Sequence, residues 1–493
     1  MPRRWLGMYV HMHWGYHHPY AARTWTLEDW RAYLGGISAL GYNLLQIWPM
    51  VDTMPLPLTP SDEAHLDKLR QVIELAHREH NLTVWLVLSA NAVGNAQAAS
   101  YPFEERPYFT TERRLNPGDR RERAELMVAR RAFLEPLAEA DGLSIIDSDP
   151  GGYEGSPPAE FVQLLLDHRR LADRLRPGMR LNYWMWWGWR PKVVEVPNAA
   201  ELRDRVLGET LAALTRANPE PWGLLACNRD HLRIVAEHGL QARTLYYPYG
   251  AIEDEPSVPR TNNDPARLAA TFEGLDPASY PLGAMGNAQN HVLQLPHTYL
   301  FAQLARGRGA EAANLLKFAK ELIPALGDEV AEGWAALADG DGARAAAARE
   351  RLLAAAAGAR AGRLGGLMFH DPARFLGDLA GQLAQWEATL ALREALAQGC
   401  DPVPAAQRLL AALEEGLART GFRDFYVGAF AATMHPLLAA LAGQLSGGAA
   451  LQRALDEYAH LRQNHVPERH GYLARLVAAL AECAGLRESP RDL

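Results

Sequence analysis

The sequence is poor in cysteine, and its positive charge is not concentrated anywhere. Its 493 residues include three cysteines, Cys227, Cys400 and Cys483, which lie far apart. A disulfide framework and a thiolate metal cluster are therefore not indicated. The 50 Lys and Arg residues against 58 Asp and Glu give a net charge of -8. Because the arginines are spread along the chain, no basic stripe forms and we expect no nucleic-acid partner.

Long apolar runs are also missing. Polar residues interrupt each hydrophobic stretch before it reaches the length of a membrane span, so we expect no membrane partner. The opening MPRRWLGMYVHMHW is basic at its start but has no apolar core of a signal peptide. We therefore expect a cytoplasmic protein. The 48% hydrophobic and 22% charged composition is that of a globular chain long enough for two domains.

Short apolar runs alternate with helical patterns along the first 310 residues. Strand-helix alternation predicts a parallel sheet with helical crossovers, and eight units close most simply into an α/β (β/α)8 TIM barrel. An open doubly wound sheet is the alternative, but no Gly-rich phosphate loop follows the first run. The expected strands are 5–14, 44–50, 83–93, 143–149, 180–189, 222–228, 244–250 and 280–289.

Two helix starts are marked by their sequence. Thr26 with Asp29 has the spacing of a capping box, and Thr59 precedes Pro60 as an N-cap precedes a first-turn proline. Beyond about residue 310, Ala, Leu and Arg dominate and strand-like runs vanish. We predict a catalytic barrel over 1–310 and an all-α C-terminal domain over 311–493. For the C-terminal domain we leave two roles open: it forms a homodimer contact, or it forms one wall of the site.

In a barrel, chemistry is expected at the C-terminal ends of the strands. Here these ends carry aromatic rings, amides and histidines, which suit a sugar because its ring faces stack and its edges carry hydroxyls. Early or mid-run tryptophans are more simply core residues. The residues expected to contact substrate are His11, Trp14, Tyr16, His17, Trp48, Asn91, Tyr183, Trp187, Asn228, Tyr247, Tyr249, Asn287, Asn290 and His291.

Two carboxylates end the fourth run, in SIIDSDPGGYEGSP. Residues two apart on a strand share a face, so Asp147 and Asp149 are expected to project together. Neighbouring carboxylates push their pKa values apart, which favours one as acid and the other as ionised stabiliser. Glycosidic bond cleavage needs this division of labour. A purely capping role is less favoured, because Ser156 is a better cap candidate for the next helix.

The segment IIDSDPGG resembles the fourth strand of the retaining hexosaminidases and O-GlcNAcases, which ends in an acidic pair. GAMGNAQNHVLQLPHTYLFA resembles the Asn-containing segment that leads into the last barrel helix of the O-GlcNAcase group. The resemblance implies that Asp147 orients the substrate's 2-acetamido group, which itself attacks the anomeric carbon. It implies that Asp149 protonates the leaving oxygen and that Asn287 and Asn290 contact the sugar. Here, however, Ser148 separates the two carboxylates.

Two features leave alternatives open. Without the acetamido mechanism, the pair supports an inverting reaction in which His13 or His17 helps to activate water, so His13 joins the two aspartates as a catalytic candidate. The loop 94–123 is rich in arginine, which matches the carboxylate of a uronate or sialic acid if some of these residues point inward. They are Arg106, Arg113, Arg114, Arg120, Arg121 and Arg123; most are expected on a solvated surface.

The HMH motif also suggests a metal-dependent hydrolase, because His11 and His13 could direct both imidazoles at one ion. The amidohydrolase pattern then needs histidines on the fifth and sixth strands and an aspartate on the eighth, which are missing. A non-catalytic sugar-binding barrel is the third possibility. The favoured prediction is an exo-acting glycoside hydrolase that removes a terminal sugar from a small carbohydrate, with no metal or organic cofactor.

Overall fold

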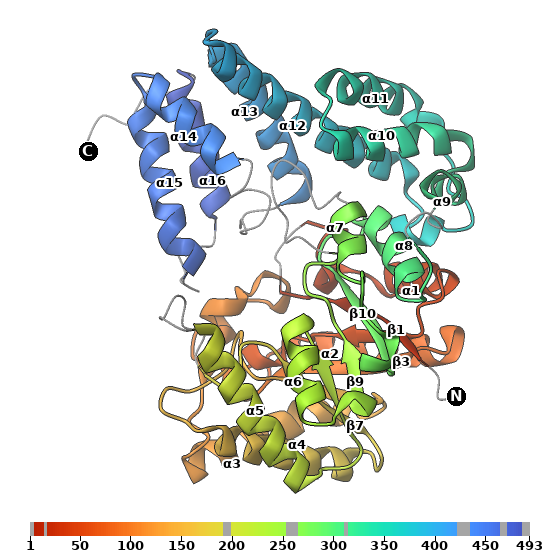
Figure 1. The fold of residues 1–493 in the computed structure, drawn as a ribbon, viewed down its shortest axis with the longest axis vertical. Helices are drawn as coiled ribbons and strands as arrows, with labels where there is room; N and C mark the ends of the chain where they lie inside the picture. The colour runs from red at the N-terminus through yellow and green to blue at the C-terminus, as the bar shows by residue number, and fades with distance from the viewer. Residues whose placement is uncertain are drawn as a thin grey trace.

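A computed structural model shows a closed barrel of eight parallel strands, which confirms the predicted fold (Figure 1). The structure describes residues 4–13, 17–190, 199–252, 265–309, 314–421, 434–463 and 471–485. Around the barrel the strand order is β1-β10-β9-β8-β7-β6-β3-β2. These strands are β1 (Trp5–Val10), β2 (Leu44–Ile47), β3 (Thr83–Ser89), β6 (Gly142–Ile146), β7 (Arg180–Met185), β8 (Trp222–Ala226), β9 (Thr244–Tyr246) and β10 (Gly283–Ala288).

Helices connect successive strands on the outside of the barrel. Both predicted helix starts are present: Thr26 and Asp29 form a capping box at α1, and Thr59 caps α2 with Pro60 in its first turn. Ser156 is not a cap, since Pro157 occupies that position before α4. The barrel helices are α1 (Leu27–Ala39), α2 (Pro60–His80), α3 (Arg120–Leu134), α4 (Pro158–Leu175), α5 (Ala199–Ala217), α6 (Arg229–Glu237), α7 (Pro265–Ala270) and α8 (Leu295–Leu304).

The segment after β3, expected as one arginine-rich loop over 94–123, has structure of its own. A short antiparallel ribbon joins β4 (Ala92–Gly94) to β5 (Glu112–Arg114), and α3 already begins at Arg120. Gly94 fits because a Cβ there would meet the backbone carbonyl of Met54 at 2.5 Å. The ribbon is thereby held against η2 (Val51–Thr53), which follows β2.

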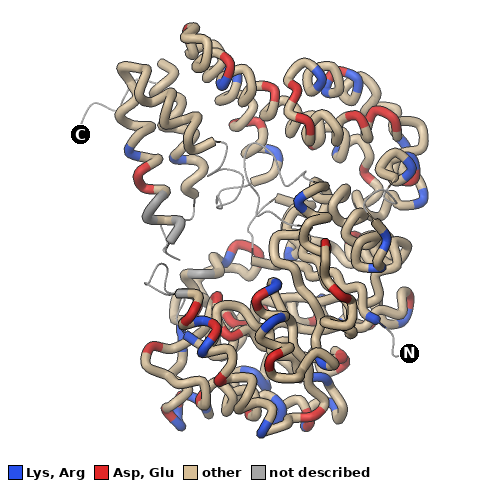
Figure 2. Tube along the Cα trace, viewed as in Figure 1, with Lys and Arg blue, Asp and Glu red and all other residues tan. Residues whose placement is uncertain are grey.

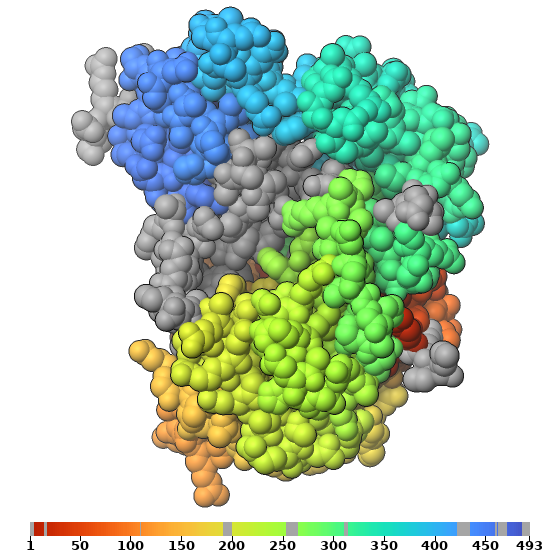
Figure 3. All heavy atoms as spheres, in the orientation of Figure 1, coloured from red at the N-terminus to blue at the C-terminus, as the bar shows by residue number. Residues whose placement is uncertain are grey.

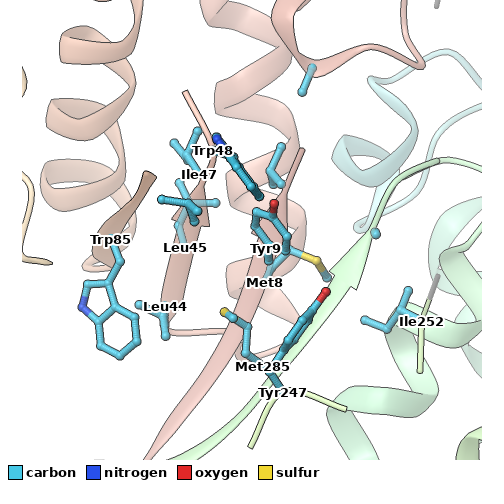
Figure 4. Close-up of a cluster of buried hydrophobic side chains, with 14 of the residues drawn as sticks. Met8, Tyr9, Leu44, Leu45, Ile47, Trp48, Trp85, Tyr247, Ile252 and Met285 are labelled. Carbon is cyan, nitrogen blue, oxygen red and sulfur yellow. The ribbon is translucent and has the colours of Figure 1, made fainter. Parts of the chain in front are cut away.

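The barrel interior is filled in layers, as expected for eight strands. A polar layer includes Gln46 of β2, which accepts a 2.8 Å hydrogen bond from Ser144 of β6, the next strand but one. Nearer the carboxyl ends lies an aromatic layer, in which Trp184 has ring centroids 5.1 Å from Tyr9 and 5.0 Å from Tyr247. Figure 4 shows Tyr9 and Tyr247 with Trp48 beside them. This aromatic layer lies under the barrel mouth.

The chain beyond the barrel is helical in its described part, as predicted. Figure 3 shows this part, coloured cyan to blue, at one end of the molecule, with the barrel at the other. One hydrophobic cluster runs from the barrel through Trp386, and a second from Ala388 to the last helix. The helices are α9 (Leu315–Leu322), α10 (Gly327–Asp339), α11 (Gly342–Ala355), α12 (Pro372–Gln398), α13 (Val403–Thr420), α14 (His435–Gln444), α15 (Gly448–Gln463) and α16 (Tyr472–Cys483). A domain boundary at residue 310 stays a prediction.

The segment after β1 is attached to the helical part. The backbone N–H of His17 donates a 2.9 Å hydrogen bond to the carbonyl of Thr420, the last residue of α13. The Tyr20 hydroxyl donates to the buried carboxylate of Asp378 on α12, which also pairs with Arg374 at 2.9 Å. Both α12 and α13 therefore contact the segment that follows β1, which we call the first barrel loop.

Charge is mixed along the described chain. Figure 2 shows basic and acidic residues interspersed over the barrel helices and the helical part. Many of them pair on the surface, such as Arg31 with Glu79 at 3.1 Å. Within the described ranges, no helix is both long and apolar enough to cross a membrane.

Candidate active site

Asp147 is the first of the two carboxylates at the end of β6. It is 0% exposed. Its Oδ2 accepts hydrogen bonds from the Tyr183 hydroxyl at 2.8 Å and from the backbone N–H groups of Trp186 and Gly188, both at 3.1 Å. Its Oδ1 accepts from Ser148 at 2.9 Å. Burial raises the pKa of Asp147 to about 6, and these hydrogen bonds oppose the rise. The Asp147 carboxylate therefore holds the turn after β7 in place.

Asp149 lies in a different environment. The strand ends at Ile146, and Asp149 has a φ of +76°, so the alternation that predicted a shared face does not extend to this pair. That expectation is wrong. Oδ2 of Asp149 accepts a 3.0 Å hydrogen bond from the indole N–H of Trp186. The charge of Asp149 acts on His11, His13 and Tyr108, which places it at the barrel mouth.

His11 and His13 follow β1 and hydrogen-bond to each other. Their Nδ1 atoms are 2.8 Å apart. Burial lowers the pKa of His13 to about 3, with Asp149 opposing the fall and Arg23 adding to it. Burial also lowers the pKa of His11, and the nearby His13 and His291 add to that effect. Burial thus favours the neutral form of both imidazoles.

Trp48 and Tyr108 enclose the His13 ring, with centroids at 4.5 Å and 4.1 Å. Both residues bond to the buried carboxylate of Asp52, at 2.8 Å from the Trp48 indole and 3.3 Å from the Tyr108 hydroxyl. Arg130 of α3 compensates Asp52 at 2.9 Å, and neither side chain is exposed. This buried ion pair holds one wall of the site in place.

The opposite side of the mouth carries Tyr247 and Asn287. Nδ2 of Asn287 donates a 2.7 Å hydrogen bond to the Tyr247 hydroxyl, and the same asparagine lies close enough to His11 to oppose the lowering of its pKa. Trp186 extends this side outward, because its ring contacts that of Tyr249 edge to face at 4.7 Å. Tyr249 is 43% exposed. Of the predicted residues, the structure thus brings Asp149, His11, His13, Trp48, Tyr247, Asn287 and Tyr249 together.

Several predicted contacts have other roles. Tyr183 packs against Phe161 of α4 and supports Asp147, so it points away from the barrel interior. Trp187, 38% exposed, lies one residue out of phase with Trp186. Asn228 is the N-cap of α6. All three residues were expected to contact substrate for the same reason. Each was placed by its position in an apolar run, and the run does not give the direction of the side chain.

Further predicted residues are buried behind the mouth. Asn91 donates to the carbonyls of Leu115 and Gly152, which ties the segment after β3 to the turn after β6. Asn290 accepts from the backbone N–H of Leu293 at 3.3 Å. His291 bonds to the Tyr33 hydroxyl at 2.9 Å, and burial lowers its pKa to about 3. His17 is exposed beside α13. Trp14 and Tyr16 lie outside the described residues.

The arginines of 94–123 have protein partners in three instances. Arg106 is fully buried and pairs with Asp62 of α2 at 2.6 Å. Arg113 pairs with Glu125 of α3, and Arg123 lies 3.2 Å from Asp167 of α4. Arg114 lies on the same ribbon face as Glu112, whose pKa burial raises to about 7 against the opposing charge of Arg114. Among the arginines of 94–123, Arg114 is therefore the one that best fits the hypothesis of an acidic sugar.

Sequence reasoning left out Tyr9, Tyr108, Asp52, Trp184 and Trp186 as site residues. Tyr9 lies two residues before His11, and Trp184 and Trp186 follow the inward-facing Asn182. The period of two along β1 and β7 was therefore a usable signal. Asp52 and Tyr108 come from short 3-10 turns. No local pattern marks them.

The metal hypothesis requires converging ligands. The Nδ1 atoms of His11 and His13 lie 2.8 Å from each other, so these two nitrogens do converge, and a metal site would need further ligands beside them. Over the residues that the structure describes, no group of three or more His, Cys, Asp or Glu side chains is arranged to hold a metal.

The fold and the mouth define a TIM barrel with a polar, aromatic-lined site at the carboxyl ends of its strands. No protein-family model matches the chain, and no curated protein matches it either. Solved structures with a similar arrangement include a GH138 enzyme targeting pectin rhamnogalacturonan II. Its TM-score is 0.47 at 9% identity, over 92% of this chain and 68% of that one.

Two other solved structures have a similar arrangement. CpGH84D has a TM-score of 0.44 at 11% identity, over 86% of this chain and 70% of that chain. The chitobiase FjGH20 of Flavobacterium johnsoniae has a TM-score of 0.41 at 11% identity, over 97% of this chain and 78% of that chain. At this level the likeness describes architecture, and we draw no functional conclusion from it.

Proposed function

We propose that this chain is an exo-acting glycoside hydrolase with Asp149 as its general acid. The observation that carries the proposal is the position of Asp149 at the barrel mouth, bonded to the Trp186 indole and within electrostatic reach of His13. A carboxyl group bordered by aromatic rings suits protonation of a glycosidic oxygen while a sugar stacks beside it. The substrate is a small carbohydrate, and the protein acts in the cytoplasm.

Asp147 is assigned a positioning role in this proposal. All four donors around its carboxylate come from its own turn or from β7 and the turn that follows. By fixing the backbone at Trp186, Asp147 sets where the indole meets Asp149. A direct contact of Asp147 with a 2-acetamido group, as the resemblance implies, requires this buried carboxylate to exchange a partner for substrate.

Two kinds of terminal sugar are supported by different residues. An N-acetylhexosaminide is favoured by the resemblance of the fourth and eighth strands. An acidic sugar such as a uronate or sialic acid is favoured by Arg114, which is half-buried on the ribbon beside the mouth. A screen with nitrophenyl or methylumbelliferyl glycosides of N-acetylhexosamines, uronic acids and sialic acid separates the two.

The screen is run with and without EDTA. We expect release from one class of glycoside, with the same rate after exhaustive chelation, because the proposed acid and its neighbours need no ion. Activity that EDTA abolishes and zinc restores would assign the site to the metal-dependent hydrolases. If no glycoside is cleaved but one of the sugars binds, the non-catalytic sugar-binding barrel replaces the hydrolase.

A further inference from the structure

The ribbon of β4 and β5 has two faces, and its contacts with α3 identify the outer one. In an antiparallel ribbon, residues directly opposite each other share a face, and successive residues along a strand alternate between the faces. Arg113 lies opposite Val93 and pairs with Glu125 of α3. Val93 lines a cavity beside Glu125 and Ala129 of α3. This face of the ribbon is therefore directed at α3, on the outside of the barrel.

The other face carries Glu112 and Arg114, which are two residues apart on β5. We call it the ribbon face. Both side chains are partly exposed. Within the part of the chain that the structure describes, neither of them forms an ion pair or a hydrogen bond with another side chain. A carboxyl group and a guanidinium thus share one surface and keep hydrogen-bonding capacity for a ligand.

Contacts at both ends of β5 place the ribbon at the barrel mouth. Tyr108 precedes β5 in a short 3-10 turn, and its ring packs on that of His13 with centroids 4.1 Å apart. At the other end, the Asn91 side chain donates to the carbonyls of Leu115 and Gly152, at 2.7 Å and 3.3 Å. Gly152 belongs to the turn after β6. β5 therefore runs along the rim of the mouth, between His13 and that turn.

The charged groups around Glu112 come from its own strand, from η2 and from the turn before β5. Burial raises the pKa of Glu112 to about 7; Arg114 opposes the rise and Asp52 of η2 adds to it. Burial also raises the pKa of Tyr108, and the charges of Glu112 and Asp149 are among those that add to the rise. Near neutral pH, Glu112 is therefore in part a carboxylic acid, which can donate a hydrogen bond.

We propose that the ribbon face is a subsite for the carboxylate of an acidic sugar, in which Arg114 supplies the cation and Glu112 donates a hydrogen bond. A guanidinium matches a carboxylate in charge and geometry, whereas a neutral N-acetylhexosamine has no anion for Arg114. Of the two classes of sugar considered above, the ribbon face thus selects the acidic one. The inference rests on the proposed function for the ligand being a sugar.

The proposal makes binding depend on pH. A ligand carboxylate brings a further negative charge beside Glu112, so binding favours the protonated form of this side chain. Above about pH 7, where free Glu112 is mostly ionised, binding therefore takes up a proton. Affinity for an acidic sugar is then highest on the acid side of neutrality and falls as the pH rises through about 7.

The test is isothermal titration calorimetry of the full chain with sodium glucuronate and sodium N-acetylneuraminate. We expect one of them to bind about tenfold more tightly at about pH 6 than at about pH 8.5, because each pH unit above the pKa of Glu112 lowers the affinity by up to roughly a factor of ten. Buffers of different ionisation enthalpy should reveal the proton uptake at the higher pH. Glucose and N-acetylglucosamine are the neutral probes, and they should bind more weakly and without this dependence on pH.

Two variants separate the two roles. Glu112→Gln keeps a donor that does not titrate, so the affinity for the acidic sugar should be equal at both pH values. Arg114→Met removes the cation and should weaken binding about tenfold or more at both pH values. Arg113→Met is the matched control, because Arg113 is the next residue along β5 and lies on the outer face, paired with Glu125. It should bind as the wild type does.

Equal losses of affinity in the Arg113 and Arg114 variants would overturn the proposal. So would failure of both acidic sugars to bind, or a dependence on pH that persists in Glu112→Gln. If an acidic sugar binds with proton uptake but no glycoside is cleaved, the proposed hydrolase function fails and the subsite stands. If an N-acetylhexosaminide is cleaved and neither acidic sugar binds, the hydrolase function stands and the subsite fails.

Discussion

The indole N–H of Trp186 donates a hydrogen bond of 3.0 Å to Asp149, while its backbone N–H donates one of 3.1 Å to Asp147. One residue thus contacts both carboxylates that end β6. Asp147 is enclosed by donors from the protein, and Asp149 lies beside the histidines of β1. The two aspartates therefore have different surroundings, although they are separated by only one residue.

Replacing Asp149 with asparagine tests its proposed role as general acid. We expect Asp149→Asn to lower hydrolysis by at least ~100-fold, the usual scale for losing a general acid. The fold should survive, since an amide can still accept from Trp186. Asp141→Asn is the control, because Asp141 precedes β6 at the other end of the barrel and pairs with His77 there. Equal rates for the Asp149 variant and the wild type would remove Asp149 from the mechanism.

Asp147 makes stability depend on pH. Its pKa is raised from 3.8 to about 6, so the folded state holds a proton that the unfolded state releases. Stability from this group is fully present below about pH 4 and is lost as pH rises to about 6. The total is on the order of 3 kcal/mol for a shift of this size. Urea unfolding from pH 4 to 7 should show the wild type losing its advantage over Asp147→Asn, and a constant difference would contradict this.

Arg130 supports the wall of the site through Asp52. Arg130→Met leaves a fully buried carboxylate without its cation, and we expect a loss of about 3–5 kcal/mol in unfolding free energy. Arg131→Met is the matched control. Its exposed pair with Glu135 at 2.7 Å should contribute less than about 1 kcal/mol. Similar losses in the two variants, measured by denaturant unfolding, would show that the buried pair does not hold the wall.

Tyr20 joins the first barrel loop to α12. Tyr20→Phe leaves the buried carboxylate of Asp378 with one donor fewer, and we expect destabilisation of about 1–3 kcal/mol. Tyr101→Phe serves as the control, since Tyr101 is 38% exposed on the barrel surface. Calorimetry should show a lower midpoint only for Tyr20→Phe. An unchanged midpoint would mean that the loop is held by other contacts.

Much of the fold could be predicted because local patterns determine it. All eight barrel strands coincide with short apolar runs, and the starts of α1 and α2 carry their capping residues. The β4–β5 ribbon was not foreseen, because its segment AVG is short and ERR is polar. Such a ribbon depends on the tertiary contact between Gly94 and Met54, which no window of sequence contains.

The sequence predicted residues of the site correctly only where these residues lie at the end of a barrel strand. His11, His13 and Asn287 follow or end their strands and lie near one another, as expected. Tyr183 was misplaced because an apolar run does not say which alternate residues face inward; Asn182, hydrogen-bonded to Ser144 within the barrel, fixes that phase. Asp52 contributes through three-dimensional proximity alone. Its position after β2 indicates neither its burial nor its partners.

The attachment of His17 to Thr420 has a consequence for the order in which the chain can be completed during synthesis. β1 is the first strand of the barrel to be made but pairs with β10, the last one. The loop that follows β1 then waits for α12 and α13, which are made some 350 to 400 residues later. The surroundings of the histidines at the mouth are complete only once β10, which carries Asn287, has been made. A nascent chain that stops after the barrel would carry every proposed catalytic group and still lack the contacts that settle its first loop.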